Sequence, residues 1–148
     1  MRRFTLFCLL FFAINAFSQT QRALPLAKYG DNLSQPLTAK ERAFIDEVYG
    51  QHANKFVYSN PHRLKAIKHI LRNRVVIKEM MIDDPKKAYP KLSKVPLQTG
   101  FVSNLKRDKI FNPEDFNPLK YQFKFYARGG AGYRVDGTNY HIFIKSQF

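Results

Sequence analysis

Cysteine is almost absent from the chain. The one cysteine among the 148 residues is Cys8, which lies in an apolar N-terminal stretch. Without that stretch the protein has no thiol, which excludes disulfides, cysteine catalysis and zinc–thiolate sites. A protein of this kind depends on its hydrophobic core, and roughly 130 residues are enough to build one.

Long hydrophobic runs are also missing. The run from Phe4 to Ala13 is too short for a comfortable membrane span, and no later stretch is longer. Arg2 and Arg3 precede it, and Ala16-Phe17-Ser18 follows as a small-x-small cleavage site. We therefore predict a signal peptide over residues 1–18, export to the periplasm or the extracellular space, and no integral membrane segment in the mature chain.

Carboxylates are few. The sequence has 11 acidic residues against 25 lysines and arginines, a formal charge of +14. Loss of Arg2 and Arg3 with the signal peptide lowers this to 14 − 2 = +12. Such a charge favours anionic partners. Outside the cytoplasm these include acidic polysaccharide, lipopolysaccharide and acidic protein surfaces.

Motifs with a known chemical role are absent too. There is no G-x-S-x-G or H-E-x-x-H pattern, and the four histidines lack the short spacing of metal ligands. We expect no catalytic residue, no metal site and no cofactor.

The C-terminal region has the clearest structural pattern. Apolar and polar residues alternate strictly over 119–126, which predicts a half-buried strand. Asp136-Gly137 predicts a two-residue hairpin turn between strands at 132–135 and 138–145, with Val135 opposite Thr138. The three strands would form an antiparallel meander with one apolar face.

Two helices precede this region. Thr38-Ala-Lys-Glu41 is a capping box that opens a helix at about 39–49, and Asn60-Pro61 opens another at about 61–72. A β-branched run predicts a further short strand at 74–80. The expected fold is α+β: an extended leader (19–36) and one domain (37–148), with the two helices covering one face of the meander.

Two basic surfaces follow from these expectations. The outer face of the meander would carry the candidate binding residues Lys120, Lys124, Tyr126, Arg134, His141 and Lys145. The second helix would present a secondary basic surface of Lys65, Lys68 and Arg72. The alternative for both is an ordinary solvated face.

Three stretches also carry a resemblance. Asn117–Tyr126, Tyr133–Tyr140 and the Asn60–Arg74 helix resemble a family of small uncharacterised secreted bacterial proteins. The resemblance implies an exported, small α+β protein, and it implies no activity and no site residues.

Three functions remain open at this point. The first is a non-enzymatic binding protein for an anionic partner. The second is a small secreted hydrolase with a non-standard site, for example His141 with Asp46 or Glu47. The third is a structural accessory subunit of an envelope complex.

Overall fold

The computed structural model describes residues 23–24, 33–80 and 88–146. The predicted signal peptide and most of the leader lie outside these residues. The helical elements are α1 (Ala39–Tyr49), a 3₁₀ turn (Gly50–His52), a π-helical turn (Asn54–Tyr58), α2 (Pro61–His69), a second π-helical turn (Ile70–Arg74), and 3₁₀ turns at Leu92–Lys94 and Pro118–Lys120. The strands are β1 (Ala23–Leu24), β2 (Val75–Glu79), β3 (Ala131–Arg134) and β4 (Tyr140–Ile144). The described residues contain no helix that is long and apolar enough to cross a membrane.

Side chains cap both α-helices. Thr38 Oγ1 accepts from the Glu41 amide at 3.1 Å, and the Thr38 amide donates to Glu41 Oε2 at 2.8 Å. α1 ends at Gly50, whose φ of 51° is costly for a residue with a Cβ. Asn60 Oδ1 accepts from the Arg63 amide at 3.0 Å and caps α2, with Pro61 at the first helical position.

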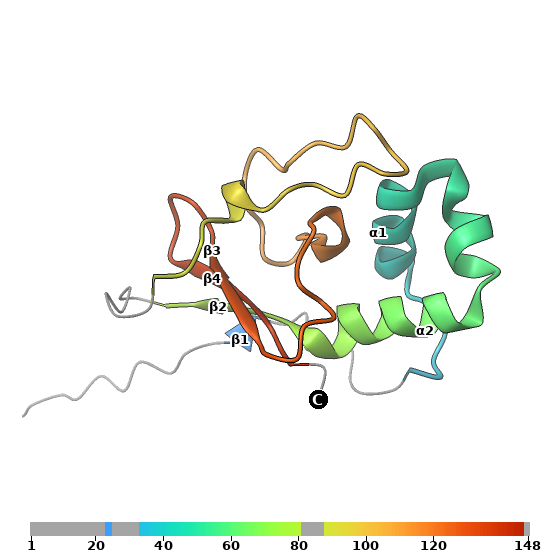
Figure 1. Cartoon of the computed structure of the whole chain (residues 1–148), viewed down its shortest axis with the longest axis horizontal. Coiled ribbons are helices and arrows are strands. Elements are labelled where there is room, and N and C mark those ends of the chain that lie inside the picture. The colour runs from blue at the N-terminus through green and yellow to red at the C-terminus, as the bar shows by residue number, and fades with distance from the viewer. Residues whose placement is uncertain (1–22, 25–32, 81–87, 147–148) are drawn as a thin grey trace, which may run out of the picture.

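The sheet is antiparallel, with strand order β1-β2-β4-β3 (Figure 1). β2 follows α2 directly and pairs with β4 over five residues, so that Ile77 lies opposite Ile142. The sheet therefore joins the middle of the chain to its end, and the mixed α+β class is confirmed.

The predicted strand at 119–126 is wrong. The chain forms a 3₁₀ turn at Pro118–Lys120 and then an irregular segment whose single bridge joins Tyr121 to Leu97. The Phe123 amide bonds to the Tyr121 carbonyl and the Phe125 amide to the Phe123 carbonyl, each at 2.8 Å, so these groups pair locally. The alternation correctly indicates the buried and exposed side chains from Tyr121 to Tyr126, though not at Lys120, which is buried, and it does not specify a partner strand.

The hairpin register also differs from the prediction by two residues. Tyr133 lies opposite Ile142, and the Val135 amide donates to the Tyr140 carbonyl at 2.9 Å. A two-residue type I′ turn needs positive φ at both central residues, whereas Gly137 has it and Asp136 does not. Thr138 Oγ1 donates to the Val135 carbonyl and accepts from the Tyr140 amide, which stabilises the longer loop. A shift of two keeps the same side chains on the inner face.

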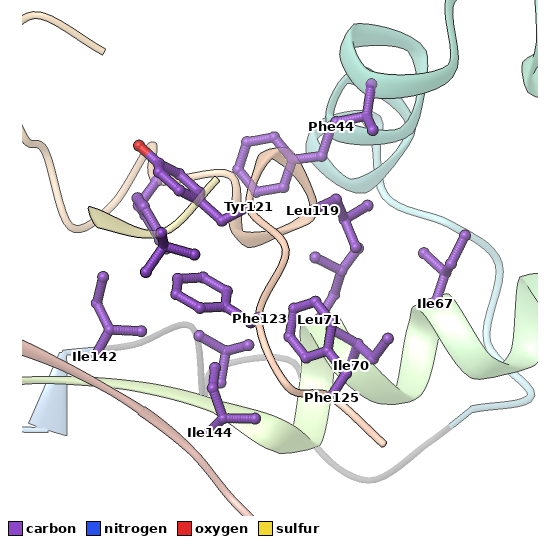
Figure 2. Close-up of a cluster of buried hydrophobic side chains, with 14 of the residues drawn as sticks. Phe44, Ile67, Ile70, Leu71, Leu119, Tyr121, Phe123, Phe125, Ile142 and Ile144 are labelled. Carbon is purple, nitrogen blue, oxygen red and sulfur yellow. The ribbon is translucent and has the colours of Figure 1, made fainter. Parts of the chain in front are cut away.

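The core lies between the sheet and the helices (Figure 2). The irregular segment provides its aromatic layer, with the Phe123 ring 4.8 Å from that of Tyr133 on β3. Asn117 ties this layer to α1 by donating to the Phe44 carbonyl at 2.9 Å. We expected the two helices to lie directly on the sheet. Instead, in Figure 1 they stand at one end of it, beside the segment that contains Leu119 and Phe125.

Candidate functional site

The outer-face residues do not form one basic surface. Lys120 is only 3% exposed, and its Nζ lies 2.9 Å from Glu47 Oε1 and 2.7 Å from Asp108 Oδ1. Burial alone would lower the pKa of Lys120, but the bonds to Asp108 and Glu47 outweigh it, and the pKa is raised. The prediction of an exposed Lys120 is therefore wrong: it is a charged bridge in the packed interior.

His141 is also buried, at 2% exposure. Its ring meets that of Tyr89 edge-on at 5.4 Å, and Tyr89 meets Phe143 at 5.5 Å. Tyr89 approaches so closely because Gly132 has no side chain: a Cβ there would lie 2.5 Å from the tyrosine ring. This part of the outer face is an aromatic layer rather than an open cationic surface, and Arg134 is half-buried beside it.

The prediction of a secondary basic surface is wrong for two of its three residues. Lys68 is 8% exposed and donates to the Leu33 and Gln35 carbonyls at 3.2 and 2.5 Å. Arg72 is 4% exposed. Lys65 alone is exposed.

Arg72 is held by a buried carboxylate. Its Nε lies 2.6 Å from Glu41 Oε1 and its Nη2 lies 2.8 Å from Glu41 Oε2. Burial alone would raise the pKa of Glu41, but the bonds from Arg72 and Thr38 and the charge of Arg72 hold it below its ordinary value. The pair links the π-helical turn after α2 to the cap of α1 and has a structural role.

Arg74 differs from Arg72. It is 2% exposed, and its guanidinium donates to the Lys145 carbonyl from Nε and Nη2 at 3.2 and 2.7 Å and to the Phe125 carbonyl from Nη1. It forms no ion pair with any carboxylate in the described part of the chain. Burial lowers the pKa of Arg74, although a guanidinium stays protonated.

Arg74 lines a cavity of about 340 Å³, which we call the Arg74 cleft. Its wall is formed by α2, by Tyr126 from the irregular segment and by Leu33. The lining residues are Leu33, His62, Lys65, Ala66, His69, Ile70, Arg74 and Tyr126. None of them is acidic, and several are cationic or aromatic.

A second cavity, of about 360 Å³, is also lined by Tyr126. It shares Ile70 and Tyr126 with the Arg74 cleft and contains Arg63, whose Nη2 donates to the Tyr49 hydroxyl at 2.9 Å. It too has no acidic lining residue. Tyr126, which is 60% exposed, therefore lines two cavities whose described lining residues include no carboxylate.

The structure thus regroups the predicted residues. Lys65, from the helix surface, and Tyr126, from the sheet surface, line one cleft. Lys145 is exposed and its carbonyl accepts from the guanidinium of Arg74, and Lys124 is exposed and adjacent to Phe125, whose carbonyl does the same. Arg74 is not among the predicted site residues, because a basic residue at the start of a β-branched run is typical of a strand end.

A histidine–carboxylate pair of the expected kind is not formed. Asp46 accepts from the Tyr58 hydroxyl at 2.6 Å, and that bond, with burial, raises the pKa of Tyr58 to about 12. Glu47 bonds to Asn117 and Lys120. The proposed pairing of His141 with Asp46 or Glu47 is therefore wrong. Among the described residues, no cluster of three or more histidines and carboxylates has the geometry to hold a metal ion.

Comparisons with known proteins add no relative: no family model, no curated protein and no solved structure matches the chain. The chemistry of the site therefore follows from its geometry. A buried guanidinium, exposed cations and an exposed aromatic ring, with no carboxylate among the described residues that line the two cavities, suit the binding of an anion.

Proposed function

We propose that the protein is an exported, non-enzymatic binding protein that engages an anionic partner at the end of the molecule around Arg74. The observation that carries this proposal is the unequal distribution of carboxylates. Glu41, Glu47, Asp108 and Asp115 are each bonded to a cation elsewhere in the described structure. Around Tyr126, the described residues that line the two cavities include no carboxylate.

Exposed cations surround the same region. Lys124 and Arg128 flank Tyr126 in the chain. The Lys145 carbonyl accepts from Arg74, and Ser146 Oγ, from the next residue, donates to the Arg128 carbonyl. Because none of the described residues that line these cavities is a carboxylate, none of them cancels the positive potential locally. Acidic polysaccharide, lipopolysaccharide and an acidic protein surface are the partners that this potential would attract.

Export is the other part of the proposal. Its support is the sequence of residues 1–18, which lie outside the described structure, together with the resemblance to small secreted bacterial proteins. Detection of the mature N-terminus by mass spectrometry of the exported protein tests it.

The binding test is a salt series on immobilised heparin and on lipopolysaccharide. Attraction to a polyanion releases counterions, so the affinity should fall linearly on a log–log plot against salt. The informative variant is Lys124→Gln, Arg128→Gln and Lys145→Gln together. Its matched control, Lys55→Gln, Lys94→Gln and Lys106→Gln, removes the same charge from exposed positions that line neither cavity.

We expect the first variant to lose the salt-dependent retention and the control to keep most of it. Equal losses in both would mean that only net charge matters. No retention of the unmodified protein would overturn the proposal.

A second function, an accessory subunit of an envelope complex, is favoured by an aromatic cluster on the surface. Phe56 is 40% exposed, and its ring lies 5.0 Å from that of Phe101 and 6.1 Å from that of His52. A photo-crosslinker at position 56 tests this function in the exporting cell. One discrete crosslinked species would favour it, and its absence would count against it.

A further inference from the structure

We infer that the Arg74 cleft binds a small organic monoanion, with a carboxylate head on the Arg74 guanidinium and an apolar body against Ile70, Ala66 and the Tyr126 ring. The inference rests on the proposed anion-binding function and names the ligand class and the site. It stands on three features of the cleft: a buried charge with no carboxylate partner among the described residues, a small volume and a mixed lining.

The charge comes first. Taking a cation out of water costs several kcal/mol after relaxation, and carbonyl dipoles offset only part of this cost. Arg72 meets the cost with Glu41, whereas the described partners of Arg74 are two carbonyl groups. Three of its five N–H groups are used in these bonds. An anion in the cleft would supply the missing negative charge, and a carboxylate suits the planar guanidinium.

The volume limits the size of the ligand. At about 340 Å³ the cleft lies near the lower end of the range for small-molecule sites, about 300–1,000 Å³. Arg74 is only 2% exposed, so a charged group on a polymer backbone cannot approach it as easily as a single small molecule can. The cleft and the exposed cations around it therefore select different anions.

The lining determines the rest of the ligand. Leu33, Ala66 and Ile70 contribute apolar surface, and Tyr126 contributes an aromatic face that is 60% exposed. Lys65 stands on the same helix, one turn before His69, and adds positive charge at the exposed side. A ligand with an apolar body and one anionic end would bury its body against these apolar and aromatic side chains. Its charge would lie near the cationic side chains.

The test is calorimetric titration of the purified protein with octanoate at low ionic strength. The uncharged 1-octanol and the cationic octylamine have the same apolar body and serve as ligand controls. We expect octanoate to bind at least tenfold more tightly than 1-octanol and octylamine to show no binding. Equal binding of octanoate and 1-octanol would overturn the inference, because the charge would then not be recognised.

Two variants locate the site. Arg74→Met removes the charge, and Ala66→Leu fills part of the cleft while it leaves every charge in place. Each should weaken octanoate binding at least tenfold, whereas Lys55→Gln should leave it unchanged. If Arg74→Met fails to fold, Ala66→Leu alone tests the site. An octanoate affinity that is the same in Ala66→Leu as in the unmodified protein would place the site elsewhere and overturn the inference.

The heparin series separates this inference from the proposed function. If octanoate does not bind but the protein is retained on heparin and the triple variant is not, the proposed function stands and the cleft is not a ligand site. Octanoate bound in the cleft without retention on heparin would support the cleft and limit the function to small anions. Failure of both would overturn both.

Discussion

Two arginines on one turn of helix have opposite surroundings. Arg72 and Arg74 are both nearly inaccessible, at 4% and 2% exposure. Arg72 faces Glu41 in a geometry with two short N–O contacts, and Arg74 faces two carbonyls beside a cavity. The comparison shows that burial of a cation does not by itself indicate its role. The charge of its partner distinguishes a structural bridge from a candidate binding group.

The largest loss of stability is expected from a change to the Glu41–Arg72 ion pair. Glu41→Leu leaves the Arg72 charge buried without its carboxylate partner. Loss of one member of a buried ion pair costs about 3–5 kcal/mol. Urea denaturation measures the free energy of unfolding. The double variant Glu41→Leu with Arg72→Met removes both charges and should be more stable than Glu41→Leu alone. A double variant as unstable as the sum of the single variants would show that the pair is not coupled.

The same pair should make stability depend on acid. The folded-state pKa of Glu41 is below its ordinary value of 4.5, so its contribution is present above that value and is lost as the pH falls through the lowered one. The stability difference between the wild type and Glu41→Gln should therefore shrink in acid. Arg74→Met should keep the pH profile of the wild type, because Arg74 has no carboxylate partner among the described residues.

Arg74→Met should destabilise the protein less than Glu41→Leu. It leaves the Phe125 and Lys145 carbonyls without their donors, at about 1–3 kcal/mol, but it leaves no buried charge unpaired. Urea denaturation measures this loss as well. A loss as large as that of Glu41→Leu would contradict the contrast between the two arginines.

The smallest effects separate two lysines of α2. Lys68→Gln loses charged donors to the Leu33 and Gln35 carbonyls and should cost about 1–2 kcal/mol. Lys65→Gln, on the exposed side, should change the free energy of unfolding by less than about 0.5 kcal/mol. Its expected effect is on octanoate binding instead. A reversed order would mean that the helix faces have been assigned wrongly.

Features that depend on neighbouring residues were predicted correctly, and features that depend on partners far away in the chain were not. The two arginines show the same contrast, because their partners in space, and not their positions in the chain, distinguish them. The capping box of α1, the Asn60 cap of α2 and Gly50 act within a few residues, so the sequence pattern predicts them directly. The alternation from Tyr121 to Phe125 correctly indicated buried and exposed side chains. It failed to predict the backbone partners, since a half-buried segment has the same pattern whether or not it joins a sheet.

The charged residues show this limit most clearly. Lys68, Arg72, Arg74 and Lys120 are buried, although long cationic side chains are mostly exposed. Each is buried because a distant part of the chain supplies acceptors, for example Glu41 for Arg72 and Asp108 for Lys120. Contacts at that separation leave no local pattern, so the sequence analysis placed three of these four on solvated faces.

By itself, the sequence determined the excess of positive charge, the presence of a single cysteine, the helix caps, the side-chain alternation and the mixed α+β class. These properties depend on composition or on neighbours within a few positions. The tertiary structure alone decided which cations are neutralised and which remain exposed, where β2 pairs, and that Lys65, Arg74 and Tyr126 line one cleft. The physical reason is that a charge acquires its energy from what surrounds it in space, and residues far apart in the chain provide those surroundings.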